Sequence, residues 1–311
     1  MKIGFNADLN TRSVDDAVAG ARAAEKAGFD DYFCPGGWRD TVTLLTCAGR
    51  EVPRIGLGSS IVSIWGIKPV VLAEQALTVN QALGGRFILG LGLSHFHMVE
   101  GRLGMKFERP IRYMREYLTI LRQAMETGKV DFDGEMLSAH TQLKLEGTVP
   151  PRVLFAALGP QAVKVAGAWS DGTITFMVTP RTHETMTVPV ASAAAKEAGR
   201  QKPWFCVSAP VCVTNNPQEA RAAAAIAWAP YGNGYYPSYR AALDQDGVKG
   251  PEDAAIIGDE ATVRQGIERY RDAGADEFIG ITFGKPEDMA RTNAYLATLS
   301  EYNGKPIKTR T

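Results

Sequence analysis

The sequence lacks the features that mark membrane proteins and exported proteins. None of its 311 residues belongs to an unbroken apolar run of about 18, the length that crosses a bilayer as a helix. The opening residues, Met1–Asn10, lack the long apolar region of a secretory signal peptide. We therefore expect a cytoplasmic protein with no membrane partner.

An excess of charge of one sign is also missing. The chain has 34 Lys and Arg against 34 Asp and Glu, so its formal net charge is zero. No block of basic residues stands out, whereas a nucleic-acid-binding domain needs a basic patch or stripe. We expect no nucleic-acid partner.

Cysteine is scarce and follows no metal-binding pattern. Cys34, Cys47, Cys206 and Cys212 show no CxxC spacing, and all four lie in apolar segments. Free buried thiols have this setting. We expect a reduced protein and assign no metal ligand.

The chain does contain the composition of a substantial core and a repeating order of strands and helices. Its residues are 45% hydrophobic and 22% charged, as in ordinary globular proteins. Alternation of short apolar strands with helices favours a closed parallel barrel. An open dinucleotide-binding sheet would need a glycine fingerprint where Asp8–Thr11 stands. The predicted strands are Lys2–Ala7, Phe29–Cys34, Ile55–Ile61, Gly84–Gly92, Val153–Ala157, Gly172–Met177, Phe205–Val213 and Glu277–Phe283.

Helices are predicted between these strands. Ser13 is placed to cap the first of them, and Val130–Glu146 is typical of a polar hairpin inserted between barrel elements. We therefore expect one (β/α)8 TIM-barrel domain over residues 1–311, with insertion segments. The predicted helices are Val14–Ala27, Thr41–Arg50, Pro69–Leu83, Lys106–Glu126, Pro160–Ala168, Pro180–Ala198, Pro217–Asp244, Ala261–Ala273 and Glu287–Glu301.

The stretch Gly84–His97 reads as a turn, a buried strand and a glycine-rich loop before a helix. Glycine lets a backbone take positive φ and approach a ligand closely. Barrel active sites gather at the carboxyl ends of the strands. The stretch indicates a ligand site, and an ordinary tight βα turn is the alternative.

Four segments, in order along the chain, resemble the bacterial luciferase-like monooxygenase superfamily of flavin- or deazaflavin-dependent barrels. They are Leu57–Ser63, Gly85–His95, Ala157–Gly172 and Ile256–Phe278. Within it, Leu93–Leu118 resembles the actinobacterial branch that uses the deazaflavin coenzyme F420. The resemblance implies an oxidoreductase that moves a hydride between C5 of coenzyme F420 and a small organic substrate, as a homodimer.

Two other functions stay open. One is an FMN-dependent monooxygenase of the same fold, and the other is a cofactor-less barrel that binds a ligand or a partner. A deazaflavin reacts poorly with oxygen and with single electrons, which favours a reductase or dehydrogenase. Neither the substrate nor the direction of the reaction follows from the sequence.

The resemblance also implies which residues contact the cofactor. The family carries a non-proline cis peptide in its third strand, which bulges against the ring, and by position this is Ser60–Ile61. Pro160 would stand first in a helix whose free N–H groups bind a phosphate. Coenzyme F420 and FMN both bear a phosphate, so this motif does not separate them. The implied contacts are Ser60, Ile61, Ser63, Leu93, Ser94, Leu158, Gly159, Gln161 and Ala162.

The acid and base of the reaction are harder to place. Related deazaflavin-dependent sugar-phosphate dehydrogenases carry an Asp-His pair after strand two and a Glu after strand four. Here those positions read Gly36-Gly37 and, approximately, His95. Their acid–base assignment therefore does not transfer. His95, with His97 beside it, is our candidate catalytic residue because imidazole titrates near working pH; a merely structural histidine is the alternative.

Two further groups of residues lie in the implied neighbourhood of the ring. Trp38, Trp65 and Phe176 would bound a flat substrate slot. An arginine-rich helix is predicted to present a salt-bridged, solvated face, with one or two arginines near the acidic tail of coenzyme F420. Its charged residues are Glu108, Arg109, Arg112, Arg115, Glu116 and Arg122.

Overall fold

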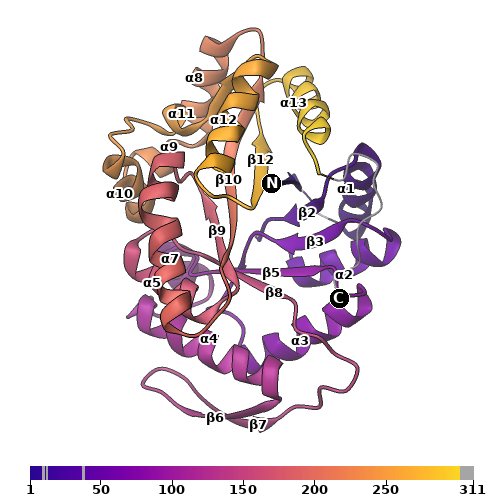
Figure 1. The fold of residues 1–311 in the computed structure, drawn as a ribbon, viewed down its shortest axis with the longest axis vertical. Helices are drawn as coiled ribbons and strands as arrows, with labels where there is room; N and C mark the ends of the chain where they lie inside the picture. Colours follow the sequence, from indigo (N-terminus) through magenta and orange to yellow (C-terminus); the bar gives the residue numbers. More distant parts are fainter. Residues whose placement is uncertain (9–10, 12, 37–38, 302–311) are drawn as a thin grey trace.

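Eight parallel strands close into a barrel in the computed structural model of the chain, which describes residues 1–8, 11, 13–36 and 39–301 (Figure 1). The last barrel strand pairs with the first, so the predicted closed barrel is confirmed. In spatial order the strands are β1 (Lys2–Asn6), β2 (Asp31–Cys34), β3 (Gly56–Ser59), β5 (Phe87–Gly92), β8 (Arg152–Ala156), β9 (Gly172–Phe176), β10 (Trp204–Val213) and β12 (Glu277–Thr282).

Helices surround the barrel and connect successive strands (Figure 1). The predicted cap of the first helix is confirmed, because the Ser13 side chain accepts from the Asp16 N–H while Asp16 accepts from the Ser13 N–H. The main helices are α1 (Val14–Ala27), α2 (Thr41–Glu51), α3 (Pro69–Ala82), α4 (Pro110–Thr127), α5 (Pro160–Trp169), α7 (Val188–Glu197), α12 (Glu260–Asp272) and α13 (Pro286–Thr298). Shorter helices before α7 are α6 (Pro180–Thr182) and the π-helix η2 (His183–Thr187).

Two helix predictions are wrong in their extent. The helix α4 begins at Pro110, not Lys106, because Arg109 is left-handed and proline favours the first helical position. Residues Met98–Arg102 form a separate π-helix, η1. The predicted helix 217–244 is broken where Gly234 takes positive φ, since proline and glycine interrupt helices. It consists of α8 (Pro217–Ala227), α9 (Ala229–Gly232) and α10 (Pro237–Gln245).

The inserted hairpin is present as β6 (Lys129–Asp133) and β7 (Ser138–Gln142), at the lower edge of Figure 1. It packs on α4 through Glu116, whose carboxylate accepts from the N–H groups of Glu135, Met136 and Leu137. Glu116 is therefore buried, which corrects its predicted place on a solvated face. The sequence also gave no sign of α11 (Pro251–Ala254) or of β11 (Ile256–Gly258), which adds to β10.

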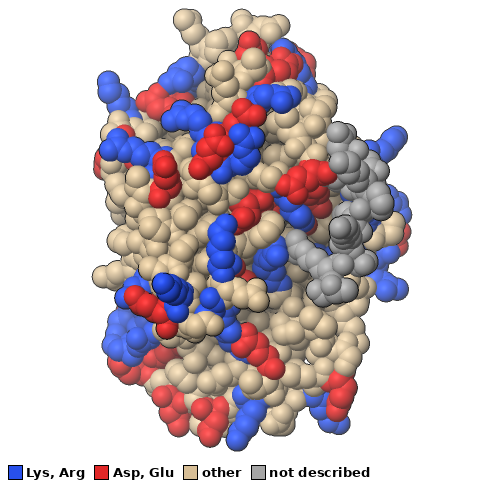
Figure 2. Space-filling view, viewed as in Figure 1, with Lys and Arg blue, Asp and Glu red and all other residues tan. Residues whose placement is uncertain are grey.

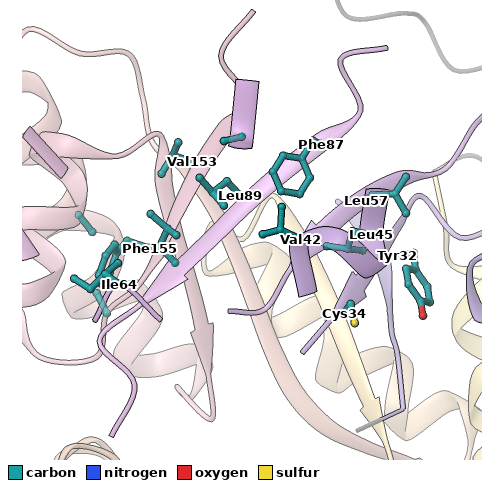
Figure 3. Packing of buried hydrophobic residues seen from close by; sticks show 14 of the residues in the cluster. Tyr32, Cys34, Val42, Leu45, Leu57, Ile64, Phe87, Leu89, Val153 and Phe155 are labelled. Atoms are coloured by element: carbon teal, nitrogen blue, oxygen red, sulfur yellow. The ribbon is translucent and has the colours of Figure 1, made fainter. Parts of the chain in front are cut away.

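Two layers of packing hold the barrel together. Outside it, residues such as Leu57, Phe87 and Leu89 meet Val42 and Leu45 of α2 (Figure 3). Inside it lies a smaller buried cluster of Phe33, Ile88, Leu154, Ile174, Cys206 and Ile279. The interior is therefore filled by side chains, which confines ligands to the ends of the barrel.

The remaining sequence-level expectations concern thiols and charge. The four cysteines are free, and Cys47 alone among them is only half-buried. Figure 2 shows Lys and Arg interspersed with Asp and Glu over the visible face. Within the described ranges, no helix is both long and apolar enough to span a bilayer.

Candidate active site

The third barrel strand is interrupted at Ser60 and Ile61. The strand β3 ends at Ser59, and pairing with β5 resumes at β4 (Val62–Ser63). Between the paired positions, the chain advances from 58 to 62 on this strand but only from 88 to 91 on β5. An extra residue on one strand defines a β-bulge. The peptide bond Ser60–Ile61 is cis, as predicted.

Three glycines leave room for this bulge. A Cβ at Gly36 would lie 2.0 Å from the Ile61 carbonyl oxygen, and one at Gly90 would lie 1.9 Å from the Ser59 carbonyl oxygen. A Cβ at Gly92 would lie 2.9 Å from Cδ1 of Ile61. Gly90 and Gly92, within β5, therefore accommodate the neighbouring strand, beyond any role in a turn. Gly37 lies outside the described residues.

Serine hydroxyls line the interruption. Ser59 Oγ donates to the Gly90 carbonyl and accepts from the Gly90 N–H, each at 2.9 Å, so it bridges the two strands. The Ser60 N–H donates to the Cys34 carbonyl at 2.9 Å, while Ser60 Oγ is buried without a partner among the described residues. Ser63 Oγ accepts from the Trp65 N–H at 3.4 Å. Ser60 thus holds a buried hydroxyl that a ligand could engage.

The loop after β5 begins with Leu93, Ser94 and His95, all half-buried. Ser94 has a φ of 57°, in the left-handed region that residues other than glycine seldom occupy. Such backbone conformations cluster at binding and catalytic sites. The loop therefore holds a constrained turn beside the bulge.

His95 lies against aromatic rings. Its imidazole stacks on Tyr236 with centroids 4.0 Å apart, and His97 lies at 5.7 Å. Burial, and secondarily the charge of His97, lowers the pKa of His95 to about 4. At neutral pH the ring is therefore uncharged, so it offers one N–H and one lone pair but no extra proton. In this form His95 can take part in a hydrogen bond to a ligand.

The helix α5 begins at the carboxyl end of β8. Pro160 occupies its first position after Gly159, and no described side chain caps it. A Cβ at Gly159 would meet nothing within 4 Å, so the space before the helix is open. The N–H groups of Gln161 and Ala162 belong to this first turn, which Leu158 precedes. Such a donor set, at the positive end of a helix dipole, fits a phosphate.

The predicted aromatic residues do not all lie together. Phe176, at the end of β9, packs edge-on against Tyr231 at 5.3 Å. Trp65 is instead buried in the core, stacked on Tyr113 at 4.1 Å, which corrects its predicted place beside a slot. Trp38 lies outside the described residues. The sequence reasoning missed the tyrosines of α9 and α10, although the run YGNGYYPSY at 231–239 is dense in them.

The arginines of α4 are mostly ion-paired, as predicted. Arg109 and Arg112 both reach Glu135 of the hairpin, at 2.6 and 2.7 Å. Arg122 pairs with Glu126 one turn further on. Arg109 and Arg112 therefore help to hold the hairpin against α4, whereas the pair of Arg122 lies within α4.

The predicted site residues follow adjacent strands of the barrel. Ser60 and Ile61 follow β3, Ser94 and His95 follow β5, and Gly159 follows β8. In the sheet these strands are consecutive, in the order β3, β5, β8. Because the strands are parallel, their carboxyl ends lie at one end of the barrel. The bulge, the constrained loop and the open helix start thus form one candidate site.

This fold defines an α/β barrel, with the candidate ligand site at the carboxyl ends of its strands. Residues 2–277 match the family of luciferase-like monooxygenases. The chain belongs to the luciferase-like monooxygenase family.

Individual relatives differ in the cofactor that their names give. A protein of Mycobacterium tuberculosis, provisionally named a coenzyme F420-dependent oxidoreductase, is 32% identical over 62% of this chain and 61% of its own. The match thus spans less than two thirds of that relative. A structure of an F420-dependent secondary alcohol dehydrogenase with an F420-acetone adduct has a TM-score of 0.77, at 20% identity over 97% of both chains. An FMN complex of a Pseudomonas putida 3,6-diketocamphane monooxygenase has a TM-score of 0.74, at 17% identity over both chains entirely.

Proposed function

We propose that the protein is an oxidoreductase that binds coenzyme F420 at the carboxyl ends of β3, β5 and β8. In this proposal a hydride moves between the coenzyme and a small organic substrate. When bound, the coenzyme would supply the two-electron chemistry at its C5, and the protein would supply positioning and electrostatics. The F420-dependent relative in Mycobacterium tuberculosis supports this choice of cofactor.

The observation that carries the proposal is the shape of the described site. The bulged backbone at Ser60 and Ile61 follows β3, and the open, uncapped start of α5 follows β8. In the sheet only β5 separates these two strands. A flat ring with a phosphate-bearing side chain needs both a backing surface and an anion site. The donors and the space in this chain therefore fit such a group.

The site residues would divide between the ring of the coenzyme, its edge and its phosphate. Ser60, Ile61 and Ser63 would back the ring, Leu93 and Ser94 would border it, and the first turn of α5 would hold the phosphate. The last group comprises Leu158, Gly159, Gln161 and Ala162. His95, uncharged at neutral pH, would donate or accept a hydrogen bond at the reacting group, and the proton that accompanies the hydride would be taken up from solvent in reduction or released to it in oxidation.

An FMN-dependent monooxygenase is the second candidate. The phosphate site does not distinguish the two cofactors, and an FMN-binding barrel shares the fold. Fluorescence titration of the purified apo-protein with each cofactor tests the choice. We expect binding of coenzyme F420 in the micromolar range or tighter, and much weaker binding of FMN. Tight FMN binding would replace the proposal by the second candidate, and binding of neither would favour a cofactor-less barrel.

The wider setting is part of the proposal. We infer that residues 1–311 act as one domain, in the cytoplasm, as a homodimer and without a metal. The balanced charge and the thiols that all remain free support such a setting. Light scattering of the purified protein should give twice the chain mass of 33.6 kDa.

A further inference from the structure

A cluster of tyrosines lies beside the candidate site. The short helices α9 and α10 and the turn between them carry Tyr231, Tyr235, Tyr236 and Tyr239, which we call the tyrosine wall. Figure 1 shows these helices gathered with α8 and α11 at one end of the molecule. No role is assigned to them in the proposed binding of the coenzyme.

The tyrosine wall contacts the ends of two barrel strands. Tyr236 stacks on His95 after β5, and Tyr235 lies 5.1 Å from His97. On the other side, Phe176 of β9 meets Tyr231 at 5.3 Å and Tyr239 at 6.0 Å. The wall therefore lies at the carboxyl ends of β5 and β9, the two strands that flank β8 in the sheet.

Three rings form one compact, near-parallel group. The centroid of His95 lies 4.0 Å from that of Tyr236 and 5.7 Å from that of His97, and the centroids of His97 and Tyr236 lie 5.5 Å apart. The planes of His95 and His97 differ by 4°, and those of His95 and Tyr236 by 27°. Aromatic rings favour such offset stacking. The other tyrosines meet Tyr236 tilted or edge-on, at 48° to 74°. A flat ligand could lie against such a group of ring faces and edges, whereas a puckered one would contact it at a few atoms only.

The wall is held in place by polar contacts outside the rings. Arg240 donates to the carbonyls of Gly232, Val248 and Lys249, at 3.0, 2.7 and 3.0 Å. Asp246 accepts from the hydroxyls of Thr182, at 2.7 Å, and Thr179. These bonds tie both ends of α10 to its surroundings, so the rings are arranged before a ligand arrives.

The polar atoms of these rings remain available. Among described residues, none hydrogen-bonds to the hydroxyls of Tyr231, Tyr236 and Tyr239 or to the ring nitrogens of His95. Nδ1 of His97 is buried and likewise has no hydrogen-bond partner among the described residues. The charged residue of α10 nearest these rings, Arg240, already donates to three backbone carbonyls and pairs with Asp244 at 2.6 Å, so its charge is compensated within the chain and a buried ligand charge would compete for it.

We propose that the tyrosine wall selects the substrate, and that the substrate is a planar, uncharged, conjugated or aromatic compound with one oxygen acceptor. This inference rests on the proposed oxidoreductase function and narrows its substrate class. The ring faces would bind the flat part, and a tyrosine hydroxyl or His95 would donate to the oxygen. A saturated compound loses the stacking, and a charged one loses its hydration without gaining a counterion.

Calorimetric titration with three probes of one size tests the inference. The probes are 2-acetylnaphthalene, its saturated counterpart 2-acetyldecalin, and the anion 2-naphthoate, each with and without coenzyme F420. We expect 2-acetylnaphthalene to bind at least about tenfold more tightly than either of the others. Equal affinity of the planar and saturated probes, or no binding of the planar one, would overturn the inference.

Variants locate the binding. Tyr236→Leu should weaken 2-acetylnaphthalene about fivefold to tenfold, because it removes one stacked ring. Tyr236→Phe keeps the ring and should keep the preference for the planar probe, which guards against misfolding of the leucine variant. Tyr295→Leu, on α13, is the control and should change nothing. Unchanged affinity in a folded Tyr236→Leu would contradict the role of the wall.

The outcomes also separate this inference from the proposed function. If coenzyme F420 does not bind but the planar preference persists, the redox proposal falls and the selectivity of the wall stands. If coenzyme F420 binds and no planar preference exists, the wall has no such role.

Discussion

The carbonyl oxygen of Ile61 occupies the space where a side chain at Gly36 would begin. The distance from that oxygen to a Cβ built on Gly36 is 2.0 Å, far inside any permitted contact. The end of β2 and the bulge after β3 therefore constrain each other. In this chain a side chain at position 36 would therefore require the backbone of one of the two strand ends to shift.

Gly36→Ala should therefore destabilise the protein. Because backbone must move to admit the methyl group, we expect a loss of about 2–3 kcal/mol in the free energy of unfolding. Urea denaturation measures it. Gly101→Ala, where a Cβ meets nothing within 4 Å, is the matched control and should cost little. Equal stability of the two variants would mean that the backbone at the ends of β2 and β3 moves to admit the methyl group at little cost.

Gly159→Asp should abolish phosphate binding while leaving the barrel folded. The position is open, and its φ of −87° suits any residue. Aspartate is a good N-cap, so stability should be kept or slightly raised, while its charge repels a phosphate. Gly159→Asn has the same shape without the charge and should weaken the coenzyme less. If both variants bind coenzyme F420 as the parent does, the phosphate lies elsewhere.

His183 should make the protein sensitive to mild acid. Its ring is fully buried beside Phe205, and burial lowers its pKa from 6.5 to about 4. The unfolded chain therefore takes up this proton first as the pH falls. The stability that the neutral ring contributes is complete above about pH 6.5, and it is lost as the pH falls toward 4. The loss should be on the order of 2–3 kcal/mol.

The measurement compares urea midpoints of the parent and His183→Leu at pH 7.0 and pH 4.5. The free energy of unfolding of the variant, relative to that of the parent, should be higher at pH 4.5 than at pH 7.0. The two proteins share their carboxylates, so the effect of carboxylate titration on stability cancels when one free energy is subtracted from the other. A pH-independent difference would mean that His183 is protonated equally in both states.

Glu277 should act in the opposite direction. It is fully buried at the amino-terminal end of β12, 3.1 Å from Trp204 Nε1. Burial, and then the charge of Asp31, raises the pKa of Glu277 well above its usual 4.5. The stability from this group is complete below about pH 4.5 and is lost as the pH rises toward its folded value.

The stability of Glu277→Gln relative to the parent should therefore increase as the pH rises. The amide needs no proton, so its free energy of unfolding relative to that of the parent should rise between pH 5 and pH 8, because only the parent must keep a buried carboxyl protonated or ionise it. Thermal unfolding at both values gives the difference. If the variant is instead less stable, relative to the parent, at pH 8 than at pH 5, Glu277 is ionised in the folded protein at pH 8.

The sequence predicted the barrel well because its strands are short apolar runs bounded by glycine and helices. It also predicted the Ser60–Ile61 bond and the Gly159-Pro160 helix start, since both follow from local motifs of the family. The broken helix after Pro217 was missed because alanine-rich sequence favours one long helix, and only Gly234 and the prolines mark the breaks.

Side-chain surroundings were harder to predict. The burial of Glu116 depends on a hairpin that folds back onto α4, and the stacking of His95 on Tyr236 joins residues far apart in sequence. No local pattern encodes either contact. Trp65 was misplaced for the same reason, because its partner Tyr113 comes from α4.

A crystal structure of the protein with coenzyme F420 tests the central claim most directly. The account predicts the deazaflavin ring against Ser60 and Ile61, with its phosphate about 3 Å from the N–H groups of Gln161 and Ala162. A coenzyme bound away from β3 and α5, or no coenzyme in crystals grown at saturating concentration, would contradict it.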